Sequence, residues 1–393
     1  MMLDPPPRLL MGSGPSNPEP RVLRALTTPP LPGDDPALEP LLDAVMRGAR
    51  DLFQTQNTCT FPVAGASRSG VEAVLAGVVE EGDRVLVGVY GHFGELLCAL
   101  AERHGAVVER VDAEWGSAID PQRLVDQIAR NPPKLVAIVH ADTSTGVLQP
   151  LEAIGRACRE ADTLLLVDAV LSLGGGEVAV DAWGLDAAAG GLQKCVGGPP
   201  GLAPVTYNER ARSALRRRAA PPHSAYLDLA RLEAAWVERR GLADATLPIP
   251  MLYGFAEALA AIGDEGLPGR WDRHERAGRA LRAGLSAMGL TLFGDSRTRA
   301  PMISIVEVPD AASEAGVRQK LLDEHGVEIM AAFGPLRGRV WRIGCMGANA
   351  RLDSVLRVLS ALEAVLAGHH VRVARGAAVE AAREAFGPPA PGS

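Results

Sequence analysis

Leu164-Leu165-Leu166-Val167-Asp168 is the stretch that decides the fold, because four apolar residues run straight into a carboxylate. A strand without polar alternation is buried on both faces, as in a parallel sheet that helices cover on each side. Ligands bind beyond the carboxyl ends of the strands in such sheets, so Asp168 is expected at a ligand-binding edge. Taken alone, an aspartate in this position more often caps the turn that follows the strand.

Similar strands recur on both sides of this stretch, between Thr58 and Tyr207. Strands are predicted over 58–64, 84–88, 107–111, 134–139, 163–167, 187–190 and 203–207. Helices are predicted between them over 69–80, 94–104, 120–129 and 151–160. Strands that alternate with helices predict an α/β fold with a mostly parallel central sheet sandwiched by helices.

The pattern changes after Ser213, where helices dominate and strands are few. Helices are predicted over 227–239, 253–262, 271–288, 315–324 and 351–366, with strands over 302–308 and 341–343. We interpret this part as a smaller α+β domain. The chain is therefore divided into an N-terminal segment, a large domain, a small C-terminal domain and a disordered tail, with ranges 1–20, 21–263, 264–386 and 387–393.

The composition of the 393 residues fits a globular protein and excludes several functions. A net charge of −7 and 4% aromatic residues offer no basic or base-stacking surface to nucleic acid. Five scattered cysteines form no CxxC pair and no Cys/His cluster, so neither disulfides nor a metal site is predicted, and a cytoplasmic location is expected. No apolar run is long enough to span a membrane, and the acidic, proline-rich first residues do not resemble a signal peptide.

Lys194 is the side chain best suited to covalent chemistry. Only three of the 40 basic residues are lysine, and Lys194 alone lies between an uncharged stretch, 187–193, and a glycine- and proline-rich one, 195–201. Arginine stays protonated, whereas a desolvated lysine can lose its proton and attack a carbonyl carbon. The alternative is a lysine that extends from a strand end into solvent.

Three further positions could bind parts of a ligand. The Gly-Ala-Ser-Arg-Ser-Gly turn at 65–70 links a strand to a helix, where backbone amides and the Arg68 guanidinium suit a phosphate. Phe93 lies at another such turn and could stack on a flat ring, although a core aromatic is equally expected. Arg342 interrupts an apolar strand and needs a carboxylate, from the protein or from a substrate. A reactive lysine, an acid, an anion-binding turn and an aromatic side chain together indicate a pyridoxal phosphate site.

The chain resembles the class V aminotransferases of pyridoxal phosphate fold type I, and within them the alanine–glyoxylate/serine–pyruvate group. The stretches that carry the resemblance are Gly14-Pro15-Ser16-Asn17, Ser144-Thr145-Gly146-Val147-Leu148-Gln149-Pro150, Leu165-Leu166-Val167-Asp168-Ala169-Val170, Gln193-Lys194 with Pro199-Pro200-Gly201, and Gly334-Pro335 with Arg342-Ile343-Gly344. The resemblance implies a homodimeric aminotransferase whose large domain binds the cofactor. Its reaction would move an amino group from a small amino acid, alanine or serine, to glyoxylate or pyruvate.

The resemblance also implies roles for individual residues. Lys194 would form the Schiff base with pyridoxal 5'-phosphate, and Asp168 would pair with the ring nitrogen. The implied cofactor contacts are Ala66, Ser67, Arg68, Phe93, Thr143, Gln193 and, from the neighbouring subunit, Thr246. The implied substrate contacts are Arg342, for the carboxylate, and the backbone from Gly14 to Asn17.

Departures from the family pattern leave alternatives open. The phosphate turn commonly reads Ser-Gly-Thr or Ser-Gly-His, where this chain has Ala66-Ser67-Arg68, and Ala243-Asp244-Ala245 replaces the usual Tyr and His near Thr246. The stretch 32–36 also differs, where substrate specificity is set. The second hypothesis is a pyridoxamine–pyruvate aminotransferase or a specialised aminotransferase of secondary metabolism. A pyridoxal phosphate lyase or desulfurase, and a scaffold protein without catalytic activity, rank below it.

Overall fold

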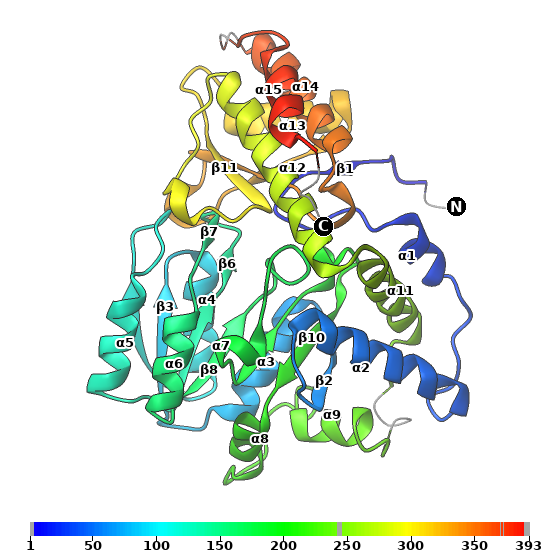
Figure 1. The fold of residues 1–393 in the computed structure, drawn as a ribbon, viewed down its shortest axis with the longest axis vertical. Helices are drawn as coiled ribbons and strands as arrows, with labels where there is room; N and C mark the ends of the chain where they lie inside the picture. The colour runs from blue at the N-terminus through cyan, green and yellow to red at the C-terminus, as the bar shows by residue number, and fades with distance from the viewer. Residues whose placement is uncertain (1–3, 242–245, 370, 372, 389–393) are drawn as a thin grey trace.

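A seven-stranded sheet forms the centre of the larger part of the molecule (Figure 1). The computed structural model describes residues 4–241, 246–369, 371 and 373–388. In order across the sheet, the strands are β2 (Cys59–Gly65), β10 (Gly201–Tyr207), β9 (Ala187–Ala189), β8 (Leu164–Asp168), β5 (Leu135–Val139), β3 (Arg84–Val89) and β4 (Val107–Asp112). Neighbours from β9 to β4 are parallel, whereas β10 is antiparallel to both β2 and β9. The predicted α/β fold with a mostly parallel sheet is confirmed.

Helices connect successive strands of the sheet, and all of them except the last and shortest lie close to the predicted ranges. They are α3 (Ser67–Val78), α4 (His92–Arg103), α5 (Pro121–Arg130), α6 (Glu152–Glu160) and α7 (Val180–Trp183). Asp120 caps α5 as expected, because its Oδ1 accepts the Gln122 N–H at 3.0 Å and Pro121 occupies the first helical position. Figure 1 shows further helices beside the β2 edge of the sheet. These are α1 (Pro20–Ala25), α2 (Glu39–Phe53), α8 (Glu209–Arg216), α9 (Leu229–Trp236) and α11 (Ile249–Glu265), of which α1, α2 and α8 have no counterpart in the predicted ranges.

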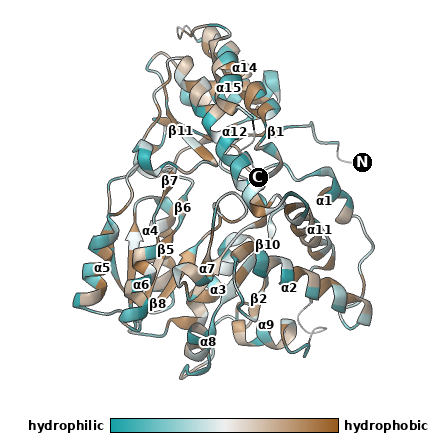
Figure 2. Cartoon of the chain, viewed as in Figure 1, coloured by the Kyte–Doolittle hydropathy of each residue, from teal (hydrophilic) through white to brown (hydrophobic). Residues whose placement is uncertain are grey.

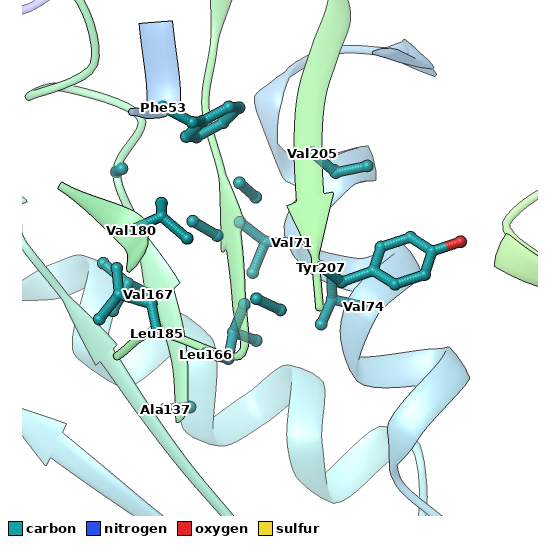
Figure 3. Packing of buried hydrophobic residues seen from close by; sticks show 14 of the residues in the cluster. Phe53, Val71, Val74, Ala137, Leu166, Val167, Val180, Leu185, Val205 and Tyr207 are labelled. Atoms are coloured by element: carbon teal, nitrogen blue, oxygen red, sulfur yellow. The ribbon is translucent and has the colours of Figure 1, made fainter. Parts of the chain in front are cut away.

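One continuous apolar core joins the sheet to its helices. Figure 2 shows hydrophobic residues gathered on the central strands, and the whole of Leu164–Asp168 is buried. Figure 3 shows Val71 and Val74 of α3 near Tyr207 of β10. The Tyr207 hydroxyl points away from this cluster and donates to Glu233 Oε2 at 3.1 Å. The other phenol of this core, that of Tyr90, donates to the Val139 carbonyl, so the core fixes the sheet without leaving either phenol unpaired.

A second, smaller unit lies above the carboxyl edge of the sheet (Figure 1). It contains a three-stranded antiparallel sheet and its own buried cluster, to which Met11 of the N-terminal segment belongs. Its elements are β11 (Ile303–Glu307), β13 (Met330–Ala331), β14 (Val340–Gly344), α12 (Leu267–Ala287), α13 (Glu314–His325), α14 (Leu352–Gly368) and α15 (Ala377–Phe386). Two short parallel strands, β1 (Leu9–Leu10) and β12 (Val327–Glu328), attach the N-terminal segment to this unit. The domain limits 1–20, 21–263 and 264–386 stay a prediction.

Two sequence expectations concern stretches that are only partly described. The substituted stretch Ala243-Asp244-Ala245 and residues 389–393 of the predicted tail lie outside the described residues. Within the described ranges, no helix is both long and apolar enough to cross a membrane.

The two glycines Gly155 and Gly263, in the middle of α6 and near the end of α11, predict opposite responses to alanine. A Cβ at Gly155 would collide with the carbonyl oxygen of Trp183, whereas a Cβ at Gly263 meets nothing within 4 Å. We expect Gly155→Ala to lower the free energy of unfolding by about 1–3 kcal/mol through overpacking. Gly263→Ala should raise it by up to about 1 kcal/mol, because alanine is the better helix former. Chemical denaturation of the two variants beside the parent protein measures both, and a shift of the same sign in both would contradict this packing.

Candidate active site

A cavity of about 360 Å³ opens at the carboxyl ends of β5 and β8, beside the first turns of α3 and α4. Backbone pairing aligns Val139 of β5 with Asp168 of β8, and Asp168 with Ala189 of β9, so three strands end at this edge. It is the edge at which the parallel sheet predicts a ligand. The residues that line the cavity are Ala66, Ser67, Arg68, Val71, Phe93, Leu96, Leu97, Leu100, Val139, Ala141, Thr143, Asp168, Val170, Leu171, Gln193 and Lys194.

Lys194 presents a buried amine at the wall of this cavity, with 8% of its surface exposed. Burial lowers the pKa of the ammonium to about 8, and the positive charge of Arg342 is the second cause. The Nζ atom donates to the carbonyl of Ser13. Gly14 lies against the amine, because a Cβ at this position would stand 2.6 Å from Nζ, and its φ of +101° also favours glycine. An amine in this setting is partly neutral near pH 8 and can act as a nucleophile or a base.

The backbone that carries Lys194 is held by contacts that the sequence did not indicate. It forms a π-helical turn over Leu192–Val196, in which Lys194 itself has φ −104° and ψ −125°. Ser16 donates its hydroxyl to the Lys194 carbonyl at 2.9 Å. Arg270 of α12 is 2% exposed and donates Nη2 to the Cys195 carbonyl at 2.8 Å. Together these bonds fix the direction in which the lysine side chain leaves its backbone.

Asp168 is buried at the end of β8 and lines the same cavity as Lys194. Its Oδ1 accepts the Val170 N–H at 2.9 Å, which is the turn cap that an isolated aspartate would make. Burial raises the pKa of the carboxyl to about 6, and the bond from Val170 opposes that rise. A cationic ring nitrogen in the cavity would compensate this buried negative charge. Asp168 can therefore cap its turn and still serve as the acid partner of a ligand.

The turn between β2 and α3 places Ala66, Ser67 and Arg68 in the cavity wall. Gln193 joins them, because its Nε2 donates to the Ser67 hydroxyl at 2.9 Å. Two buried polar atoms at this end, Ser69 Oγ and Gln193 Oε1, have no hydrogen-bond partner in the part of the chain that the structure describes. The positive N-terminus of α3, a guanidinium and an unpaired hydroxyl are the groups that a phosphate requires.

Phe93 and Thr143 complete the lining, and a buried aspartate between them was missed by sequence reasoning. Asp142 Oδ2 accepts the Phe93 N–H at 3.2 Å, and its Oδ1 accepts the Ser144 N–H at 2.7 Å. Asp142 is fully buried, so it serves as an anchor for the turn that carries the aromatic ring. The Thr143 hydroxyl is buried without a partner among the described residues, which leaves it available to a ligand oxygen.

Arg342 lies in β14 with 3% of its surface exposed, and burial lowers the pKa of its guanidinium to about 10. Its Nε donates to the Ala331 carbonyl at 2.7 Å and its Nη1 to the Thr143 carbonyl at 3.3 Å. Its Nη2 meets only the Met330 sulfur, at 4.0 Å. Asp142 and Glu328 are close enough to oppose the fall in pKa, but within the described ranges no carboxylate is among the hydrogen-bond partners of Arg342, so N–H donors are left for an anion.

Two predicted ligand contacts, Asn17 and Thr246, do not line the cavity. The Asn17 side chain is already engaged, since its Oδ1 accepts the Leu10 N–H at 2.9 Å and a second bond from Asn349 Nδ2 at 2.9 Å. Its implied substrate contact, through the backbone, stays a prediction. Thr246 has a φ of +45° and is not among the residues that line the cavity of its own subunit. Across the described residues, no cluster of three or more His, Cys, Asp or Glu side chains could hold a metal ion.

The residues present fit pyridoxal 5'-phosphate. Its phosphate would be held by Arg68 with the hydroxyls and amides at the start of α3, and its phenolic oxygen by the unpartnered Thr143 hydroxyl. Asp168 would pair with the ring nitrogen, Phe93 would cover the ring, and Lys194 would bind the aldehyde carbon.

Comparison with known proteins identifies the relatives of this arrangement. The sequence pattern of the family described as "Aminotransferase class-V" matches residues 43–337. The (S)-ureidoglycine–glyoxylate transaminase of Bacillus subtilis is 45% identical over 97% of this chain and 96% of its own length. The crystal structure of the B. subtilis ureidoglycine–glyoxylate aminotransferase superposes with a TM-score of 0.96 over 98% of this chain and 100% of that one, at 46% identity.

Two other relatives are less similar in sequence but match nearly the same length of chain. The alanine–glyoxylate aminotransferase of Drosophila melanogaster is 36% identical over 91% of this chain and 92% of its own length. The pyridoxamine–pyruvate aminotransferase of Mesorhizobium loti superposes with a TM-score of 0.92 at 29% identity, over 97% of each chain.

The lowered pKa of Lys194 predicts an amine that reacts at unusually low pH. In protein freed of cofactor, we expect acylation of Lys194 by acetic anhydride to reach its half-maximal rate near pH 8. Arg342→Gln should move that midpoint upward, because it removes a positive charge that disfavours the ammonium. Mass spectrometry of the peptides measures the labelling, with the exposed Lys320 as the internal reference for reagent decay. A Lys194 midpoint near the ordinary lysine value of about 10.4 would contradict the burial described above.

Proposed function

The chain belongs to the class V aminotransferase family, and we propose that it is a glyoxylate aminotransferase that takes its amino group from a small amino acid with one carboxylate. Two relatives support glyoxylate as the acceptor, because the B. subtilis transaminase and the Drosophila enzyme are both named for it. Pyridoxal 5'-phosphate, which class V aminotransferases use, supplies an aldehyde that bonds to amines and a cationic ring that accepts the electron pair left by the α proton.

Three residues around the cavity have separate roles in the reaction. Lys194 Nζ, partly neutral near pH 8, takes the proton from the α carbon of the amino donor and delivers it to the carbon two bonds away, on the other side of the amino nitrogen. Asp168 keeps a negative charge beside the ring nitrogen, so that the ring stays cationic. Arg342 fixes the substrate carboxylate, and with it the direction in which the α C–H bond points.

The buried guanidinium of Arg342 is the feature that indicates the substrate class. Its described partners are two carbonyl groups and a sulfur atom, so one anion completes it. A carboxylate can accept two parallel N–H bonds from such a group. Glyoxylate and the small amino acids each have one carboxylate, which matches a site with one unpaired guanidinium.

(S)-Ureidoglycine is the donor that we favour, with alanine or serine, expected from the sequence, as the second candidate. The identity to the ureidoglycine transaminase, 45%, exceeds the 36% to the alanine enzyme, over similar lengths. A ureido group brings polar N–H and C=O groups that need partners when buried. Ser13 and Glu328 lie beside Arg342, since the Ser13 hydroxyl contacts the Met330 sulfur at 3.1 Å and Glu328 accepts the Gly12 N–H at 3.0 Å. These polar side chains would suit a ureido group better than the methyl group of alanine.

We also propose a homodimer in the cytoplasm. Support for the dimer comes from Thr246, which is absent from the cavity of its own subunit and would reach the phosphate end of a neighbouring one. Support for the location comes from five cysteines that are all unpaired and buried. Light scattering on purified protein measures the oligomeric state, and fractionation of the source cells measures the location.

A donor and acceptor survey tests the proposed reaction. With glyoxylate as acceptor, we expect glycine to form from (S)-ureidoglycine with a kcat/KM at least about tenfold above alanine or serine, because its polar group is satisfied in the site. 2-Oxoglutarate should be a poorer acceptor by about 100-fold or more, since its second carboxylate would be buried without a cation.

The same survey separates the alternatives. Chromatography of the products measures glycine and the oxo acid that the donor leaves behind. Consumption of the donor without any amino transfer to glyoxylate would favour a lyase, and rapid turnover of pyridoxamine with pyruvate would favour the relative that treats the vitamin as substrate. Preference for alanine over (S)-ureidoglycine would keep the reaction class and replace the donor.

A further inference from the structure

We propose that Phe333 and His92 form a positioning pair, which we call the aromatic seat, that holds the Arg342 guanidinium in place for the substrate carboxylate. The inference deepens the proposed function and rests on it, because it concerns the same guanidinium. Neither residue was singled out by the sequence, and neither lines the cavity that fits the cofactor. They act on the substrate through Arg342.

The geometry of the aromatic seat is a stack of three planar groups. The Arg342 guanidinium carbon lies 4.3 Å from the centroid of the Phe333 ring. The His92 imidazole stacks on Phe333 with ring centroids 4.3 Å apart and an interplanar angle of 25°. Phe333 therefore has a cation near its ring and a second ring stacked on it.

The stack determines which donors of Arg342 remain for an anion. Nε is bound to the Ala331 carbonyl, and Nη1 makes a longer bond, 3.3 Å, to the Thr143 carbonyl. Nη2 has only the Met330 sulfur nearby. The ring of Phe333 stabilises the buried cation without using any of its N–H groups. The terminal nitrogens are thus left for a carboxylate while the plane of the guanidinium is fixed.

Each ring of the seat is anchored on a different part of the molecule. The His92 N–H donates to Ser144 Oγ at 2.9 Å, at the first turn of α4. The Phe333 loop is fitted against Trp115, because a Cβ at the adjoining Gly334 would stand 2.9 Å from that indole and its φ of +49° favours glycine. The seat therefore joins the seven-stranded sheet to the smaller antiparallel one.

The seat also relates the substrate to the cofactor ring. His92 is followed directly by Phe93, the residue that would cover the ring, and their backbones are fixed by the Asp142–Ser144 hydrogen bonds. Burial lowers the pKa of the His92 imidazole, and the charges of Arg68 and Arg342 lower it further, while Asp142 and Glu95 oppose them. A neutral imidazole can stack on Phe333 without placing a further cation near Arg342.

Binding of glycolate to the cofactor-loaded protein tests the seat. Glycolate has the carboxylate of glyoxylate but no carbonyl carbon to react, so calorimetry reports carboxylate recognition alone. We expect Phe333→Leu, which keeps an apolar side chain but removes the ring, to raise the dissociation constant for glycolate and the KM for glyoxylate about tenfold. The kcat and the dissociation constant of the cofactor should change less than about threefold, because the interaction lost is with the carboxylate. Phe333→Tyr should restore both values.

Two further variants serve as controls for the effect of Phe333→Leu. Phe386→Leu removes the other described ring that lies under a guanidinium, that of Arg276 at 4.2 Å, and should leave glycolate binding unchanged. Unaltered glycolate binding in Phe333→Leu, together with its loss in Arg342→Gln, would overturn the seat alone. Unaltered binding in Arg342→Gln would overturn the carboxylate assignment and the seat with it. Equal loss of cofactor and glycolate affinity in Phe333→Leu would reduce Phe333 to a structural role and also overturn the proposal.

Discussion

Burial of one amine is the constraint on which the rest of the site depends. Lys194 can be neutral near pH 8 only while water is kept from its ammonium. The glycine at position 14 lets the N-terminal segment approach the amine closely, and Ser16 holds that segment to the lysine backbone. The N-terminal residues are in turn attached to the smaller unit by the β1–β12 pairing. The reactivity of the lysine therefore requires both units and the N-terminal segment that contacts both of them.

The sheet supplies the second part of the site through register. Backbone pairing puts the last residues of β5, β8 and β9, which are Val139, Asp168 and Ala189, in register, so they reach the same edge without any side chain holding them there. The residues after each strand are then free to differ in chemistry. Asp142 anchors a turn, Asp168 faces the cavity, and the chain after β9 carries the lysine. The antiparallel β10 lies outside this run and leaves the edge undisturbed.

The sequence predicted those features that a single stretch of chain determines. The parallel sheet followed from runs such as Leu164–Asp168, and the position of Asp168 at the ligand-binding edge followed from its place at a strand end. Lys194 could be proposed from its uncharged and glycine-rich flanks, and its role stays a prediction. Arg342 could be proposed because a charge inside an apolar strand is conspicuous. The unforeseen residues act across the fold: Arg270 reaches Cys195, and Phe333 stacks on His92, over separations that no local pattern encodes. Whether Thr246 serves a neighbouring subunit depends on a second chain, which one sequence does not describe.

The charge of Arg342 links substrate binding to the basicity of the lysine. In the protein without substrate, this buried cation is the second cause of the low pKa of Lys194, after burial itself. A carboxylate bound to Arg342 cancels much of that charge, and the remaining burial still keeps the amine from water. The amine is then a stronger base with the substrate in place than without it. An unfilled site thus favours the neutral, nucleophilic amine, whereas a filled site favours the step in which Nζ must hold a proton.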